Sequence, residues 1–180
     1  MSSSAAYAVL IGTIINHLFF DARVTQAEVA QIGQYAENVF FGKPCGLMDQ
    51  TASAVGNLVT IDFFDKDHPV IKPVAFDFAS CGHALCIIDS GADHADLTDD
   101  YAAIPAEMKQ VAACFGEPYL RRIRPEEFYQ ALPKLRGKGS DRALMRAMHF
   151  FEEDERVVRQ VAALDRNDLF ALMWEFICSG

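Results

Sequence analysis

The run from Ala5 to Phe20 constrains the fold most, because its apolar residues would cover every face of a helix rather than one stripe. A helix of that kind is typical of a protein core. The run is shorter than the roughly 20 residues that a membrane span needs, and it contains Asn16 and His17. It carries no basic segment and no small-residue cleavage site, as a signal peptide would. The sequence therefore predicts a buried helix and no membrane segment.

Ser2, Ser3 and Ser4 stand at the start of this helix. Their hydroxyl groups could cap the backbone N–H groups of the first turn. The same end of a helix also attracts anions, because its dipole and its free N–H groups point outward. On the residues alone, both a plain serine cap and an anion site remain open.

A second helix is expected from a capping box at Thr25 and Glu28 to about Phe40. Its apolar residues recur at near-helical spacing and predict one buried stripe. That stripe consists of Val29, Ile32, Ala36 and Phe40. Glu37 lies beside the stripe, so on the residues alone it is a surface carboxylate.

An irregular stretch precedes Asp49. Gly42, Pro44 and Gly46 interrupt regular structure, and residues 51–55 predict the start of a helix. Asp49 is therefore expected near a helix N-terminus, beside backbone N–H groups. A carboxylate in that position is either a helix cap or a group with a chemical role.

The rest of the chain mixes strands with helices, as in an α+β protein. Residues 58–63 and 70–76 predict an antiparallel pair of strands, and the apolar run 84–89 predicts a buried strand. A polar loop is expected over 90–97. Further helices are expected from residue 98, over 125–132, from residue 140 or 141, and over 167–177.

Composition limits the possible partners. The 180 residues carry a net charge of −9 and no long Lys/Arg run, which argues against nucleic acid as a partner. A nucleotide is still possible, because local N–H groups, a few cations and a metal can hold its phosphates. The five cysteines are odd in number and have no disulfide spacing, so a reduced, cytoplasmic setting is expected.

Residues 37–42 (Glu-Asn-Val-Phe-Phe-Gly) and 44–50 (Pro-Cys-Gly-Leu-Met-Asp-Gln) resemble one continuous motif. That motif is the AEN-x-F-x-G-x-x-CG-[IL]-MDQ segment of galactokinases, which are members of the GHMP family of small-molecule kinases. Residues 2–5 are similar to the second half of the family's Gly-Leu-Ser-Ser-Ser-Ala phosphate loop. Residues 146–157 resemble its RA-x-H-x-x-x-E-x-x-R-V helix. The resemblance covers essentially the whole chain.

The resemblance implies the two-lobed α+β GHMP kinase fold, with a ribosomal-protein-S5-like N-terminal lobe and a ferredoxin-like C-terminal lobe. Residues 1–57 would be the helical part of the first lobe, and residues 58–180 would belong to the second. The family's N-terminal sugar-binding motif and its C-terminal Gly-rich motif have no counterpart in these residues. We therefore expect a fold incomplete at both ends, from a truncated gene, a remnant or a cut piece, and poor activity of the chain by itself.

The implied reaction is transfer of the γ-phosphoryl group of ATP to galactose, giving galactose 1-phosphate. The family's roles fall on Asp49 as general base, on Ser2, Ser3 and Ser4 at the phosphates, on Ser4 and Glu37 as Mg²⁺ ligands, and on Gly46, Asp49 and Tyr101 at the sugar. The usual Arg-rich continuation after Tyr101 is replaced by residues 102–105, Ala-Ala-Ile-Pro. Another GHMP kinase and a non-catalytic sugar-binding relative or remnant stay open as alternatives, as does the oligomeric state.

Overall fold

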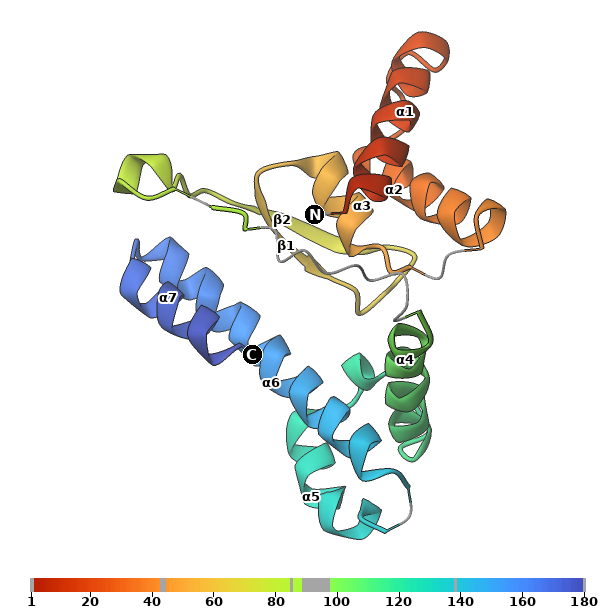
Figure 1. The fold of residues 1–180 in the computed structure, drawn as a ribbon, viewed down its shortest axis with the longest axis vertical. Helices are drawn as coiled ribbons and strands as arrows, with labels where there is room; N and C mark the ends of the chain where they lie inside the picture. Colours follow the sequence, from red (N-terminus) through yellow and green to blue (C-terminus); the bar gives the residue numbers. More distant parts are fainter. Residues whose placement is uncertain (1, 43–44, 85, 89–97, 138, 180) are drawn as a thin grey trace. The chain divides into compact units, whose positions relative to one another are not determined.

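The computed structural model describes residues 2–42, 45–84, 86–88, 98–137 and 139–179. They form two compact units, Met1–Val74 and Ala75–Gly180, and each is described by itself (Figure 1). The lobe boundary expected between residues 57 and 58 stays a prediction, because a compact unit need not coincide with a lobe of a larger fold. No helix among the described residues has the length and apolarity that a membrane span requires.

The first unit contains helices followed by one β-hairpin. Its elements are α1 (Ser3–Phe19), α2 (Gln26–Tyr35), the π-helical segment η1 (Ala36–Phe40), α3 (Met48–Val55), β1 (Leu58–Asp62) and β2 (Val70–Val74). The helices α1, α2 and α3 pack against one another. The strands β1 and β2 pair antiparallel, with Leu58 opposite Val74 and Asp62 opposite Val70, which confirms the predicted hairpin.

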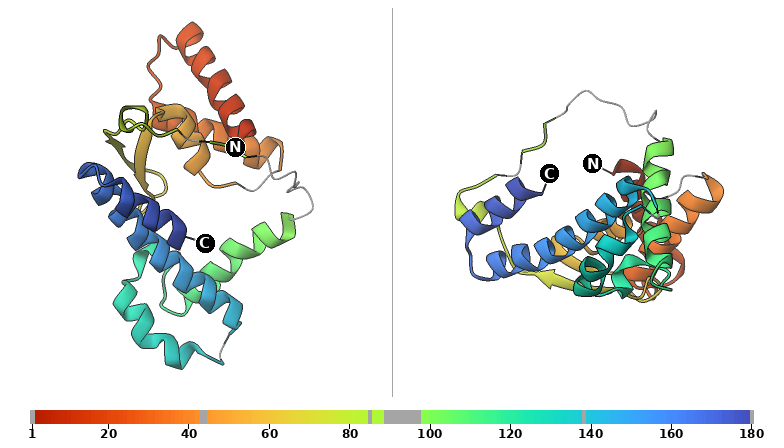
Figure 2. Two further views of the ribbon diagram at one scale, coloured as in Figure 1. Left: turned by 60° about the vertical axis from the view of Figure 1, so that its left-hand side comes forward. Right: turned by 90° about the horizontal axis from the view of Figure 1, so that it is seen from below.

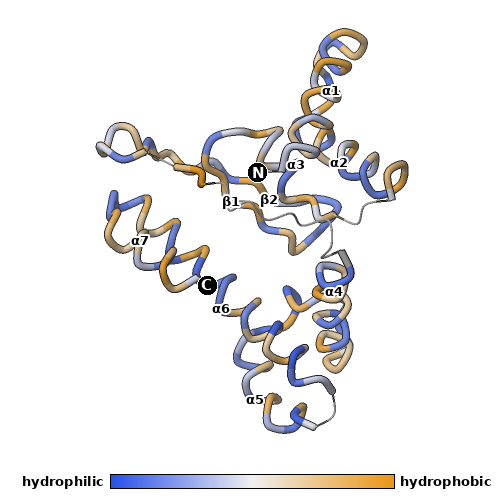
Figure 3. The backbone as a smooth tube through the Cα atoms, viewed as in Figure 1, coloured by the Kyte–Doolittle hydropathy of each residue, from blue (hydrophilic) through white to orange (hydrophobic). Residues whose placement is uncertain are grey.

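Helix α1 forms as predicted, but the expectation that it is buried on every face is wrong. Ala5 and Val9 are buried, whereas Leu18 is 70% exposed and Phe19 is 74% exposed. Figure 3 shows hydrophobic residues along the whole of α1. Among the described residues α1 packs mainly on α2 and α3, so only one side of the helix is covered.

Helices α1 and α2 run in opposite directions where they touch. A Cβ atom added to Gly12 would lie 3.2 Å from Cγ1 of Val29, and one added to Gly33 would lie 3.6 Å from Cβ of Ala8. One helical turn backward along α1 therefore corresponds to one turn forward along α2. The two glycines allow the two backbones to approach closely.

Helix α2 starts at the predicted capping box. The Thr25 N–H donates to Oε2 of Glu28 at 2.8 Å, and the Glu28 N–H donates to Oγ1 of Thr25 at 3.3 Å. The predicted apolar stripe is confirmed at Val29, which is buried, and Ala36 is half-buried. It is wrong at Ile32, which is 57% exposed, and at Phe40, which is 78% exposed. The residues that face the other helices are Val29, Ala30, Gly33 and Glu37.

The second unit is helical. Its elements are η2 (Ala79–Cys81), α4 (Thr98–Ala113), η4 (Leu120–Arg122), α5 (Pro125–Leu135), α6 (Asp141–Asp165) and α7 (Leu169–Cys178). The core gathers residues of α4, α5 and α6 around Phe128 and Phe151, whose ring centroids are 4.9 Å apart. Helices α6 and α7 lie side by side (Figure 2). The expected helices are all present.

The strand expected over 84–89 is not found in its described residues. Ala84 and residues 86–88 have no regular structure, and Ile88 is 89% exposed. Leu85 and Asp89 lie outside the described residues, as does the loop expected over 90–97. A strand needs a neighbour for its backbone N–H and C=O groups, and no strand among the described residues pairs with this segment.

Candidate functional site

Glu37 lies in the π-helical segment that continues α2. The Phe41 N–H bonds to the carbonyl of Ala36 at 3.3 Å, five residues earlier, instead of the usual four. A π-turn of this kind is rare and occurs frequently at functional sites. Glu37 is only 5% exposed, so the interpretation of Glu37 as a surface carboxylate is wrong.

The carboxylate of Glu37 has two different oxygen environments. Its Oε2 accepts hydrogen bonds from Nε2 of Gln50 at 3.0 Å and from Sγ of Cys45 at 3.1 Å. Its Oε1 is buried and has no hydrogen-bond partner among the described residues. Burying a carboxylate oxygen without a donor is costly, and a bound cation would offset that cost.

Cys45 is held in place through its backbone. Its N–H donates to Oδ1 of Asn38 at 2.8 Å, and its carbonyl accepts from Nε2 of Gln34 at 3.2 Å. These bonds tie the chain before α3 to α2 and η1. Pro44, expected to shape this turn, lies outside the described residues. Gly42 has φ +65°, a left-handed conformation that favours glycine.

Asp49 lies in the first turn of α3, which begins at Met48. This confirms the expected position near a helix N-terminus, although the helix starts earlier than residue 51. Asp49 is exposed, and its side chain makes no hydrogen bond or ion pair within the described part of the chain. Gly46 lies shortly before it, and a Cβ atom there would meet nothing within 4 Å. Open space therefore adjoins the chain just before Asp49.

The three serines occupy the start of α1 and are exposed. Ser2 is the N-cap residue, but its side chain makes no capping hydrogen bond. The plain serine cap is therefore not observed at Ser2. Gly12 is close to Val29, and Ala8 is close to Gly33. Extending this register by one more helical turn would bring Ser4 to the level of Glu37.

Tyr101 lies on α4 in the second unit and is 55% exposed. The residue before this helix, Leu97, lies outside the described residues. The described contacts therefore group Glu37, Cys45 and Gln50, while Tyr101 belongs to a unit that is described separately.

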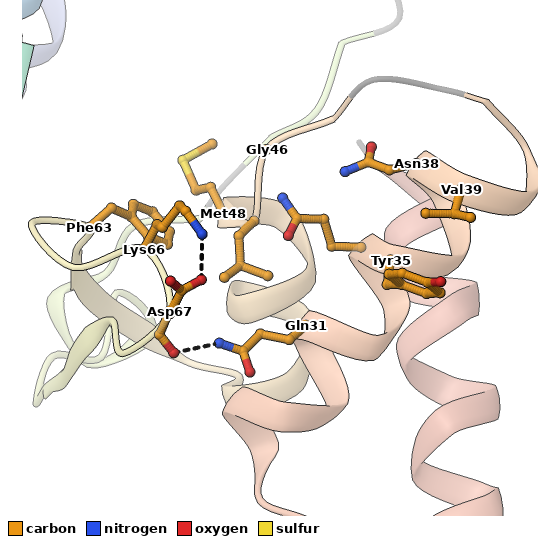
Figure 4. Close-up of a pocket in the computed structure, with 11 residues that line it drawn as sticks. Gln31, Tyr35, Asn38, Val39, Gly46, Met48, Phe63, Lys66 and Asp67 are labelled. Atoms are coloured by element: carbon orange, nitrogen blue, oxygen red, sulfur yellow. Dashed lines mark hydrogen bonds and ion pairs between the residues drawn. The ribbon is translucent and has the colours of Figure 1, made fainter. Parts of the chain in front are cut away.

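A cavity of about 690 Å³ opens beside α2 and the β-hairpin in the first unit (Figure 4). Nε2 of Gln31 donates to the carbonyl of Asp67 across it at 2.9 Å. The lining residues are Gln31, Gln34, Tyr35, Asn38, Val39, Gly46, Leu47, Met48, Phe63, Lys66 and Asp67. Gly46 is the only predicted site residue among them. No sequence pattern predicted this cavity, although polar Gln31, Gln34 and Asn38 recur on one helix face.

Comparison with known proteins agrees with the sequence motifs. Residues 1–57 match the family model described as the GHMP kinases N terminal domain. The galactokinase of Actinobacillus pleuropneumoniae serotype 5b is 36% identical over 172 residues, which are 96% of this chain and 44% of that protein. The galactokinase of Glaesserella parasuis serovar 5 is 37% identical over 172 residues, 94% of this chain and 43% of that protein.

A solved structure shows the same fold. The crystal structure of Lactococcus lactis galactokinase complexed with galactose matches with a TM-score of 0.69 at 22% sequence identity, over 98% of this chain and 45% of that chain. This match confirms the expected α+β GHMP fold. The chain spans less than half the length of the relatives that it matches. The chain is therefore a homologue of the galactokinases, and its residues 1–57 match the N terminal domain of the GHMP kinases.

Proposed function

We propose that this protein is a galactokinase, which transfers the γ-phosphoryl group of ATP to the anomeric hydroxyl of galactose. The observation that carries the proposal is the buried Glu37 carboxylate, whose Oε1 lacks a donor among the described residues. It lies in the segment that resembles the galactokinase motif, which also holds Asp49. Homology to galactokinases over most of the chain supports the same reaction.

Asp49 is the proposed general base. Its exposed carboxylate takes the proton of the anomeric hydroxyl while the sugar oxygen forms its bond to the γ-phosphorus. The bond from the γ-phosphorus to the bridging oxygen breaks, and ADP leaves. General-base assistance of this kind contributes about 10²- to 10⁴-fold in rate. Most of the remaining rate in phosphoryl transfer comes from positioning and charge neutralisation.

The start of α1 is the proposed phosphate site. Its first-turn N–H groups and the hydroxyls of Ser2, Ser3 and Ser4 would donate to phosphate oxygens, and the helix dipole favours the negative charge. Ser4 and Glu37 are the proposed Mg²⁺ ligands. The register of α1 on α2, extended by one turn, would bring them to one level, and Oε1 of Glu37 is buried without a donor among the described residues. Mg²⁺ held there would neutralise the charge of the β- and γ-phosphates.

Galactose is the proposed acceptor. Gly46 supports this role, because a side chain there would occupy the open space next to the turn that carries Asp49. Tyr101 is proposed as a further sugar contact from the family motif alone. A cytoplasmic location is also proposed, and within the described part of the chain no disulfide joins any of the five cysteines.

The direct test is Asp49→Asn, with Asp21→Asn as the matched control, in a protein extended to the length of the relatives. Asp21 is an exposed residue of the loop after α1 with φ +52°, a conformation that Asn also tolerates. We expect Asp49→Asn to lower galactose phosphorylation by about 10²-fold or more, with ATP binding and thermal unfolding unchanged. Asp21→Asn should match the wild type. Near-normal turnover of Asp49→Asn would reject Asp49 as the base.

The same assay separates galactokinase from another GHMP kinase. Galactose, glucose, mannose, mevalonate and homoserine would be compared as acceptors at equal concentration. Preference for an acceptor other than a sugar would place the protein in another branch of the family. Binding of galactose without phosphorylation of any acceptor would favour the non-catalytic alternative.

A further inference from the structure

Gln50 is among the most deeply buried polar residues of the described chain, at 1% exposed. Its Nε2 donates to Oε2 of Glu37 at 3.0 Å and lies 3.4 Å from Sγ of Cys45, and this thiol donates to the same Oε2 at 3.1 Å. We propose that Gln50 is a positioning residue, which together with Cys45 saturates Oε2 and so presents Oε1 of Glu37 to a divalent cation. The inference rests on the metal role proposed above for Glu37.

The reason lies in the chemistry of the carboxylate. Its two oxygens are equivalent until donors distinguish them, and a glutamate side chain can rotate about three torsions. Two donors on Oε2 fix the rotation and leave Oε1 as the oxygen of this carboxylate with open coordination among the described residues; Oε1 of Gln50 is likewise buried without a hydrogen-bond partner there. Mg²⁺ demands near-ideal octahedral geometry, so the orientation of each ligand affects binding. Residues that orient metal ligands typically change metal affinity by about 10- to 100-fold when they are replaced.

Glutamine at position 50 orients the Glu37 carboxylate better than glutamate or methionine would. A carboxylate accepts but cannot donate, so the amide nitrogen must face Glu37. Glutamate at position 50 would place two carboxylates together, and they would either repel or share a proton. Methionine would fill the same volume without donating a hydrogen bond.

The position of Gln50 also links the proposed base Asp49 to the proposed metal ligand Glu37. Gln50 directly follows Asp49 on α3, so one helix carries the proposed base on its exposed side and the positioning amide on its buried side. Gly33 of α2 lies close to this amide, because a Cβ atom on Gly33 would be 3.7 Å from Cγ of Gln50. The packing of α2 on α3 therefore determines where Gln50 meets Glu37.

The matched control is Thr51, the next residue along α3. Thr51 is 0% exposed, and its hydroxyl donates to the carbonyl of Leu47 at 2.8 Å, within its own helix. Thr51→Val thus removes a buried hydrogen bond of α3 without touching Glu37. A purely structural role for Gln50 would make Gln50→Met and Thr51→Val behave alike.

The experiment follows Mn²⁺ binding in the presence of ADP by electron paramagnetic resonance, with thermal unfolding recorded for each variant. We expect Gln50→Met to weaken Mn²⁺ binding by about 10- to 100-fold. Thr51→Val should bind as the wild type does, and Glu37→Gln should lose the protein-bound signal. In turnover, Gln50→Met should need more Mg²⁺ for half-maximal rate and recover at saturating Mg²⁺.

Wild-type Mn²⁺ affinity in Gln50→Met, with Glu37→Gln deficient, would overturn this inference and leave the metal role of Glu37 intact. Wild-type Mn²⁺ affinity in Glu37→Gln would overturn both the positioning role of Gln50 and the metal role of Glu37. If Gln50→Met does not fold, the second donor decides. Cys45→Ala should then weaken Mn²⁺ binding while Cys45→Ser, which keeps a donor, should retain it. Equal affinity of Cys45→Ala and the wild type would overturn the positioning role.

Discussion

Glu37 shows how burial by neighbouring helices changes the chemistry available to a carboxylate. The apolar pattern predicted that Ile32 and Phe40 would set the buried face, with Glu37 beside it. The observed contacts bury Gly33 and Glu37 instead, and the π-helical segment begins immediately before Glu37. The result is a carboxylate enclosed by helices, with a single oxygen lacking a protein donor among the described residues.

Gly33 packs against Ala8 of α1 and Gln50 of α3, which gives a prediction for two substitutions. A Cβ atom there would lie 3.6 Å from Cβ of Ala8 and 3.7 Å from Cγ of Gln50, both ordinary contacts. Gly33→Ala should therefore be tolerated, and it should stabilise the fold by about 0.5–1 kcal/mol because glycine weakens a helix interior. Gly33→Leu should destabilise it by about 1–3 kcal/mol through overpacking.

Denaturant unfolding of both variants measures this difference. Gly33→Leu should also displace Gln50 and weaken Mn²⁺ binding, whereas Gly33→Ala should not. Equal stability of the two variants would show that α1 and α3 do not enclose position 33 as described.

At the scale of elements, local signals predicted the helices well. The capping box at Thr25 and the proline that begins α5 mark helix starts through bonds made within a few residues. The buried face of α2 could not be predicted in the same way, because Gly33 carries no hydrophobic signal and is buried by the close approach of α1. The strand expected over 84–89 depends on a pairing partner, which periodicity cannot supply.

The capping box at the start of α2 predicts a measurable loss. Thr25→Ala removes the hydroxyl oxygen that accepts a hydrogen bond from the Glu28 N–H. That N–H, in the first turn of α2, then has lost its acceptor. We expect a decrease of about 1 kcal/mol in the free energy of unfolding. Thr25→Ser keeps the hydroxyl and is the control. Chemical denaturation checks the difference, and equal stability of the Ala and Ser variants would contradict a capping role.

The contact between α6 and α7 predicts a pH dependence. Glu175 of α7 accepts a hydrogen bond from Nε of Arg159 at 2.9 Å and one from Arg156 at 3.1 Å. The hydrogen bond from Arg159 is the main cause that lowers the pKa of Glu175, and the charges of both arginines act in the same direction. A lowered folded-state pKa gives stability that is complete above the unfolded pKa of about 4.3.

That stability is lost as pH falls through the lower folded pKa. The thermal midpoint of the wild type should therefore drop below about pH 4.3, and Glu175→Gln should show a shallower drop from a lower starting value. Glu126→Gln is the control, since Glu126 is exposed and makes no ion pair within the described residues. Parallel pH profiles of Glu175→Gln and the wild type would contradict the assignment.

At the scale of the whole molecule, the site motif could be identified from the sequence but its environment could not. Residues 37–42 and 44–50 resemble the galactokinase motif, so the proposed roles of Asp49 and Glu37 could be assigned without a structure. The donors around Glu37 come from α3 and from the turn before it, and only packing shows that Cys45 and Gln50 converge on one oxygen. The composition of α1 predicted a helix that is apolar on every face, but hydrophobicity reports a preference for burial and not which faces a neighbouring element covers.

The apolar side of α1 predicts self-association of the 180-residue chain. Leu10, Ile14 and Leu18 recur at intervals of four residues and are 56%, 45% and 70% exposed, so they form a stripe along the helix. Contiguous apolar surface of this kind favours burial against another molecule. Sedimentation velocity over a range of concentrations should show association, and Leu10→Lys with Leu18→Lys should reduce it without lowering the thermal midpoint. Val70→Lys, at an exposed apolar residue of β2, is the control and should associate as the wild type does. A wild-type chain that stayed monomeric at all concentrations would show that this stripe does not drive association.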